Sequence, residues 1–247
     1  MNKRILLIQI RDPKDKMLEH EADCVRRKFQ RLAVELVTVN AVEKQVEADL
    51  LKEVDGVVIG GSGDFSVHHP LSQVFVQPLF KTLEVLTQLS LPTFGICFGH
   101  QLIGAWLGSE VRTDPGRAEL GTVRVQKTPA SDECPMLHEF GTEFAVHSGH
   151  SDFVVETPLG TRVILSNEMV STQGFLVEGA PIVSVQFHPD MTGAEARSRL
   201  LAYRDGFTDR IETDAASFAK KFELGADEST QLLHAFFKSH AFSLKSD

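Results

Sequence analysis

The sequence places one cysteine where a nucleophile would stand. Cys97 lies within Gly95-Ile-Cys-Phe-Gly99, between an apolar run that begins at Thr93 and a helical pattern. Gly-x-Cys-x-Gly at a strand-to-helix junction is the cysteine version of the nucleophile elbow. The glycines allow a sharp turn, and the helix N-terminus favours a thiolate and offers N–H groups to an oxyanion. From this motif alone, a buried structural cysteine is the alternative.

A base and a carboxylate follow much later in the chain. His188 comes directly after the apolar run Ile182–Phe187 and before Pro189, which ends a strand because it cannot donate a ladder hydrogen bond. Asp190 can accept a hydrogen bond from the imidazole and orient it. Cysteine, histidine and carboxylate together provide a nucleophile, a base and an orienting group. Taken alone, His188 could equally be a structural histidine.

The first part of the chain predicts the scaffold that would position these groups. Apolar runs alternate with helical patterns, which indicates right-handed crossovers and a doubly wound, mostly parallel, flavodoxin-like α/β sheet with helices on both faces. The expected strands and helices are Arg4–Ile10, Lys14–Leu32, Val34–Val39, Glu47–Glu53, Asp55–Gly60 and Leu71–Leu91.

The later part of the chain has a different pattern. Short strands separated by turn residues predict a small added antiparallel sheet at the edge of the main one. They are expected at Glu110–Thr113, Leu120–Lys127, Thr142–Val146, Arg162–Ser166 and Thr172–Val177. Three helical patterns follow, at about Ala194–Tyr203, Ala215–Phe222 and Glu228–Phe242. We therefore expect a catalytic-type domain over residues 1–192 and a helical C-terminal extension over 193–247, packed on the same domain.

A glycine-rich loop, Gly60–Ser66, follows the strand Asp55–Gly60. It could be a phosphate-binding loop, but Pro70 delays the next helix, whereas such a loop delivers its amides to a helix N-terminus. We prefer a loop whose amides face Cys97, since open α/β sheets place their sites at the carboxyl ends of strands. His68 and His69 are expected to be surface or loop-packing residues.

Composition narrows the class of protein. The chain has 247 residues, a net charge of −9 and scattered basic residues, which argues against a general nucleic-acid binder. No run is long enough to span a membrane, and Met1 leads directly into a strand. Cys24, Cys97 and Cys134 form no paired framework or metal pattern, so a cytoplasmic setting is expected. Arg26–Lys28 is interpreted as a solvated helix face.

Several segments then resemble class I glutamine amidotransferases, in the order in which that family carries them. Gly95–Gln101 and Val185–Asp190 resemble its two signatures, and Gly60–Ser62 resembles its oxyanion loop. Arg117–Gly121 and Ser148–Asp152 are similar to segments of the glutaminase domain of GMP synthases.

This resemblance implies hydrolysis of the glutamine side-chain amide through a γ-glutamyl thioester on Cys97, with His188 moving the protons. It also implies an oxyanion hole and a substrate pocket. The N–H groups of Gly61 and Phe98 would form the oxyanion hole. The substrate pocket would be formed by Gln101, Glu119, Gly149 and His150. The family normally has glutamate where Asp190 stands, and aspartate is one methylene shorter.

No cofactor or metal is implied, and the substrate would be glutamine or another γ-glutamyl compound. Nothing in the chain resembles an ATP-using synthetase, so the ammonia would go to a separate synthetase subunit. One alternative is a free-standing hydrolase of γ-glutamyl peptides or amides. Another is a catalytically weak relative that binds a partner through its C-terminal helices.

Overall fold

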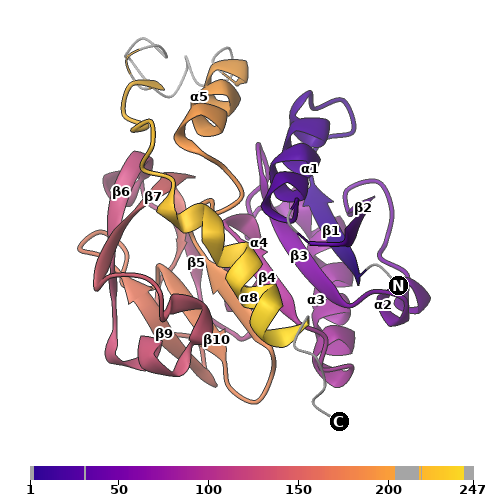
Figure 1. The fold of residues 1–247 in the computed structure, drawn as a ribbon. Helices are drawn as coiled ribbons and strands as arrows, with labels where there is room; N and C mark the ends of the chain where they lie inside the picture. Colours follow the sequence, from indigo (N-terminus) through magenta and orange to yellow (C-terminus); the bar gives the residue numbers. More distant parts are fainter. Residues whose placement is uncertain (1–2, 31, 204–216, 218, 242–247) are drawn as a thin grey trace.

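One sheet of nine strands organises the part of the chain that the computed structural model describes, residues 3–30, 32–203, 217 and 219–241. Its order is β2-β1-β3-β4-β11-β10-β9-β6-β7 (Figure 1). The first five strands pair in parallel and the others in antiparallel fashion. The strands are β1 Lys3–Ile10, β2 Val34–Asn40, β3 Gly56–Ser62, β4 Thr93–Ile96, β6 Glu119–Lys127, β7 Glu143–His150, β9 Thr161–Ser166, β10 Gly174–Val177 and β11 Ile182–Val185.

Helices cover both faces of this sheet. The α-helices are α1 Met17–Lys28, α2 Ala48–Lys52, α3 Gln73–Gln88, α4 Phe98–Trp106, α5 Gly193–Ala202 and α8 Leu232–His240. Helices α1 and α8 contribute to one apolar core, and α2, α3 and α4 contribute to the other. Short 3-10 helices lie at Pro70–Ser72, Pro115–Arg117, Pro129–Glu133, Pro135–Leu137 and Glu228–Gln231.

Strand β1 shows why the sequence forms a two-sided core. Successive side chains of a strand point to opposite faces. Ile5 and Leu7 therefore join the core under α1 and α8, whereas Leu6 and Ile8 join the core under α3 and α4. All four are fully buried, as a central strand with helices on both sides requires.

Helix α8 lies across the first of these faces (Figure 1). Its Phe236 ring meets Phe94 edge-on at 5.3 Å between centroids, and its Phe237 ring meets Phe29 at 5.6 Å. A Cβ on Gly56 would lie 2.5 Å from the Phe237 ring, so that ring fills the space above the glycine. The C-terminal helix is thus an integral part of the core.

The predicted doubly wound sheet is confirmed, with one difference in how the later strands join it. Four of the five expected short strands extend the main sheet through antiparallel pairing. Only β5 (Val111–Thr113) forms a separate antiparallel pair, with β8 (Asp152–Val154), a strand that the sequence did not indicate. The helix expected over 215–222 lies partly outside the described residues, as does Phe242. Across the described ranges, no helix is long and apolar enough to cross a membrane.

Candidate active site

Cys97 stands on a strained turn between β4 and α4. Its φ of 50° and ψ of −98° are uncommon for a residue with a side chain, and such backbone strain is concentrated at functional sites. A Cβ on Gly99 would lie 2.4 Å from the carbonyl oxygen of Ile59 in β3. Glycine is therefore required for α4 to pack this closely on the sheet, and the predicted sharp turn is present.

His188 lies next to Cys97, just beyond β11. Its backbone N–H donates to the carbonyl oxygen of His147, and its Nδ1 lies 3.0 Å from Oδ1 of Asp190. Burial acts to lower the pKa of His188, but the Asp190 carboxylate and the neighbouring Cys97 outweigh it and raise the pKa to about 9. The Asp190 carboxylate therefore favours the protonated form of the imidazole.

Asp190 is 1% exposed and remains ionised although burial disfavours its charge. The charges of His188 and Arg199, the hydrogen bond from His188 and the charge of Lys28 hold its pKa well below the usual range. Arg199 Nη2 lies 3.3 Å from Oδ2. Aspartate is shorter than glutamate, but the 3.0 Å contact with Nδ1 shows that its side chain reaches the imidazole of His188.

Gly61 and Phe98, the residues predicted to form the oxyanion hole, both lie close to Cys97. A Cβ on Gly61 would lie 2.8 Å from Cε1 of His188 and 3.8 Å from Cβ of Cys97. The pairing of β3 with β4 ends at Ile59, before the glycine loop begins. Phe98 is the first residue of α4, so its N–H has no acceptor within the helix. Gly61 and Phe98 therefore both lie beside the nucleophile, and the oxyanion role of their N–H groups stays a prediction.

The four residues predicted to bind substrate lie in three places. Glu119 and His150 form a buried pair, with Oε2 and Nε2 3.0 Å apart. Asn167 Nδ2 also donates to Glu119 at 2.7 Å, and Gln173 donates to the same carboxylate. Burial acts to raise the pKa of Glu119, but the hydrogen bond from His150 and the other donors lower it.

Gln101 is already engaged by the protein. Its amide nitrogen donates to the Asp152 carbonyl oxygen at 2.8 Å and contacts Oε1 of Gln186 at 3.3 Å. Gln186 in turn donates to the Cys97 sulfur at 3.7 Å. Gln186 therefore contacts the nucleophile directly, a position that the sequence interpretation missed although it lies within the second signature.

A cavity of about 70 Å³ lies beside His188. The glycine loop contributes Gly63 to its wall, β7 contributes Gly149, and Arg199 and Tyr203 reach it from α5 and its C-terminus. Predicted residue Gly149 thus lies at the cavity rather than in the Glu119 cluster. In the chain as described, no group of three or more His, Cys, Asp or Glu side chains is arranged to hold a metal ion.

Three further expectations concern charged residues and loop histidines. His69 accepts from the Leu71 N–H, and His68 contacts Ser66 at 2.9 Å, so both are loop-packing residues as predicted. The solvated face expected for Arg26–Lys28 is wrong for Lys28, whose side chain is only 8% exposed. Its Nζ lies 3.6 Å from Oε2 of Glu195 in α5, so α5 lies over this part of α1.

The fold and the elbow define a class of protein, and comparison with known proteins identifies it. Residues 19–204 match the model of the class I glutamine amidotransferases, and the chain belongs to this family. The fold is similar to that of a glutamine amidotransferase from Thermotoga maritima, with a TM-score of 0.78 and 22% identity. That match covers 98% of this chain and all of the other.

Among curated proteins, the chain is similar to a glutamine-hydrolysing GMP synthase subunit from Sulfolobus acidocaldarius. The two are 35% identical over 164 residues, or 66% of this chain and 80% of the relative. The corresponding subunit of Methanocaldococcus jannaschii is 25% identical over 177 residues, or 72% and 86% of the two chains. The GMP synthase of Pyrobaculum aerophilum is 31% identical over 172 residues, or 69% of this chain and 30% of the relative.

Proposed function

We propose that this chain is a glutaminase that releases ammonia from the glutamine side chain through a γ-glutamyl thioester on Cys97. One observation carries the proposal: Cys97 stands on a strained elbow beside His188, and Nδ1 of that imidazole lies 3.0 Å from Oδ1 of Asp190. Cys97, His188 and Asp190 would thus act as nucleophile, proton carrier and orienting acid.

In the first half of the reaction, the Cys97 thiolate attacks the carbonyl carbon of the side-chain amide. The resulting oxyanion accepts hydrogen bonds from the N–H groups of Gly61 and Phe98, each worth about 3 kcal/mol in comparable sites. The His188 imidazolium then gives its proton to the amide nitrogen, the carbon–nitrogen bond breaks and ammonia leaves. The γ-glutamyl group remains on the sulfur as a thioester.

In the second half, water attacks the thioester. The imidazole of His188, now neutral, takes a proton from the water as the carbon–oxygen bond forms. The carbon–sulfur bond then breaks, which releases glutamate and returns Cys97 to its thiolate. Asp190 stabilises the imidazolium at both stages and keeps the same ring nitrogen directed toward the sulfur.

We propose further that a separate synthetase subunit receives the ammonia. Similarity to proteins named as subunits of GMP synthase supports this role, because such a name denotes one part of a larger enzyme. Glu119 and His150 are proposed to shape the glutamine pocket, with Gln101 and Gly149 nearby.

Ammonia and glutamate release from glutamine tests the proposal. Cys97→Ser should abolish both while leaving the melting temperature near that of the wild type. Cys134→Ser, at a buried cysteine, is the matched control and should keep activity. If the isolated chain is silent on glutamine, diazo-oxo-norleucine should still label Cys97, as mass spectrometry of the peptide would show. Unchanged turnover in Cys97→Ser, or no labelling at Cys97, would overturn the assignment.

The cavity beside His188 favours a second candidate, a free-standing hydrolase of γ-glutamyl peptides. It has a volume of about 70 Å³ and lies between the glycine loop, β7 and α5, next to the proposed base. Gly63 and Tyr203 would then lie beside a larger leaving group. Glutamate release from γ-glutamyl peptides, measured beside release from glutamine, separates the two candidates.

A further inference from the structure

Arg199 connects helix α5 to the catalytic acid. Its Nη2 lies 3.3 Å from Oδ2 of Asp190, while Oδ1 of the same carboxylate faces His188. Each oxygen of Asp190 therefore has its own cationic partner. With both held, the carboxylate cannot rotate without losing one of the two contacts.

Arg199 is an unfavourable residue to bury for stability alone. It is 7% exposed, and within the described part of the chain its Nε and Nη1 have no hydrogen-bond partner. A buried guanidinium with unsatisfied donors is costly, and an apolar side chain of similar volume is often as stable or more so. A role in the active site explains why a cation occupies this position.

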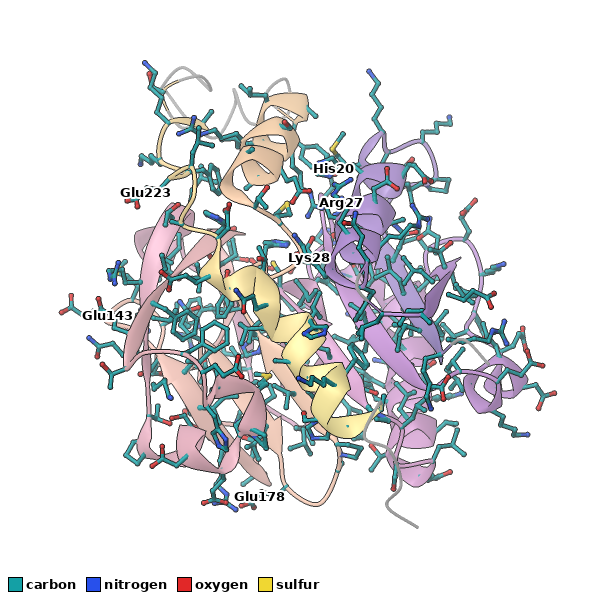
Figure 2. All side chains as sticks on the ribbon, in the orientation of Figure 1. His20, Arg27, Lys28, Glu143, Glu178 and Glu223 are labelled. Atoms are coloured by element: carbon teal, nitrogen blue, oxygen red, sulfur yellow. The ribbon has the colours of Figure 1, made fainter. Side chains whose placement is uncertain are left out.

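The helix that carries Arg199 is fixed at its N-terminus. Thr192 and Glu195 form a reciprocal capping box, and Asp227 accepts a hydrogen bond from the Gly193 N–H at 2.8 Å. Glu195 also pairs with Arg27 of α1 at 2.7 Å. Figure 2 shows Arg27 and its neighbours on the side of α1 that faces α5. Arg199 thus approaches Asp190 from a rigid element.

Other charged and titratable groups face Asp190 from α1. The Lys28 side chain is 8% exposed, and its charge favours the ionised carboxylate. Cys24 is a buried thiol whose pKa is raised to about 12, first by burial and then by Asp190. His20 Nδ1 lies 3.4 Å from Arg199 Nη2, and burial together with Arg199 lowers its pKa. These α1 groups act on Asp190 through their charge or through Arg199, whereas Arg199 contacts the carboxylate directly, as His188 does.

We propose that Arg199 is a positioning residue: it holds the second oxygen of Asp190 so that this short acid keeps His188 oriented toward Cys97. The proposal rests on the proposed glutamine hydrolysis, and it assigns α5 a direct part in the reaction. Aspartate has less reach than the family's usual glutamate, so its orientation depends more on an external support.

The rate at which iodoacetamide alkylates Cys97 tests this without any substrate. Arg199→Met should slow alkylation at pH 7 about tenfold and move the alkaline limb of the pH profile to lower pH, because a loosened Asp190 no longer keeps His188 protonated. Arg199→Lys should recover part of the rate. Arg197→Met, on the same helix, is the matched control, since Arg197 donates to the Phe222 carbonyl oxygen instead of Asp190.

Peptide mass spectrometry keeps the signal specific to Cys97. Cys24 and Cys134 are buried, with pKa values raised to about 12 and about 11, and react slowly. A folded Arg199→Met protein with the wild-type pH profile would overturn the proposal, as would a fall in melting temperature alone. If the methionine variant does not fold, Arg199→Lys decides: a several-fold slower rate supports the proposal, and a wild-type rate overturns it.

This measurement also separates the inference from the function on which it rests. Alkylation reports the orientation of His188 beside Cys97 and needs no glutamine. A shifted profile in a protein that never hydrolyses glutamine would contradict the proposed function and support the role of Arg199. Glutamine hydrolysis with no shift in Arg199→Met would do the reverse.

Discussion

Asp190→Asn removes the carboxylate that faces the buried imidazole of His188. Burial lowers the pKa of His188, yet Asp190 and Cys97 outweigh this effect and raise it from 6.5 to about 9. Because one pKa unit corresponds to about 1.4 kcal/mol, this rise stabilises the protonated folded state by roughly 3 kcal/mol. The asparagine amide has no charge, so the pKa of His188 should fall toward or below its ordinary value.

The sign of the effect follows from the direction of this shift. A group whose pKa is higher in the folded chain stabilises the fold at low pH. The contribution of His188 is complete below pH 6.5 and is lost as the pH rises through about 9. Between these limits, the wild-type free energy of unfolding in urea should fall by roughly 3 kcal/mol more than that of Asp190→Asn.

Asp49→Asn is the control, because Asp49 is an exposed carboxylate that pairs with Lys52. Between pH 6.5 and about 9, the free energy of unfolding of Asp49→Asn should change with pH as that of the wild type does, so it should differ from Asp190→Asn in the same way. In activity, Asp190→Asn should lower kcat about 10²-fold and His188→Asn about 10⁴-fold, the range of general acid–base effects. If the free energies of unfolding of the wild type and of Asp190→Asn fell by the same amount over this pH range, that result would refute the electrostatic argument. Equal losses of kcat would make Asp190 as important as the base itself.

Two further substitutions test the site around this pair. Gly61→Ala would place a Cβ 2.8 Å from Cε1 of His188. We therefore expect about a 10²-fold loss of kcat with little change in melting temperature. A normal kcat would show that the loop can move aside. Glu119→Gln leaves the amide donors of Asn167 and Gln173 facing a neutral amide. We expect the free energy of unfolding in urea to fall by about 1–3 kcal/mol and the KM for glutamine to rise. An unchanged KM would show that Glu119 does not belong to the substrate pocket.

The sequence was most informative where local rules determine structure. The elbow at Cys97 follows from two glycines at a strand-to-helix junction, and the position of His188 follows from a strand that ends at Pro189. The burial of β1 on both of its faces likewise follows from a continuous apolar run. Each of these signals lies within a few residues of the feature that it predicts.

Long-range pairing could not be predicted in the same way. The antiparallel register of Gly174 with Val185 extends the main sheet, but short alternating strands are equally compatible with a separate sheet. The surroundings of Arg199 and Lys28 could not be predicted from the sequence for the same reason. Each lies on a helix whose charged residues would ordinarily be solvated. The tertiary pairs of Lys28 with Glu195 and of Arg199 with Asp190 draw both side chains in from solvent.

The docking of α8 has a consequence for biosynthesis. Phe237 fills the space above Gly56, about 180 residues earlier in the chain. At roughly 5–20 residues per second, the ribosome completes the intervening chain in about ten to forty seconds. During that interval the face of β1, β3 and β4 that α8 later covers has no C-terminal helix to shield it. A nascent chain stalled before Leu232 would therefore present this apolar face to chaperones, and its release in that state would favour aggregation.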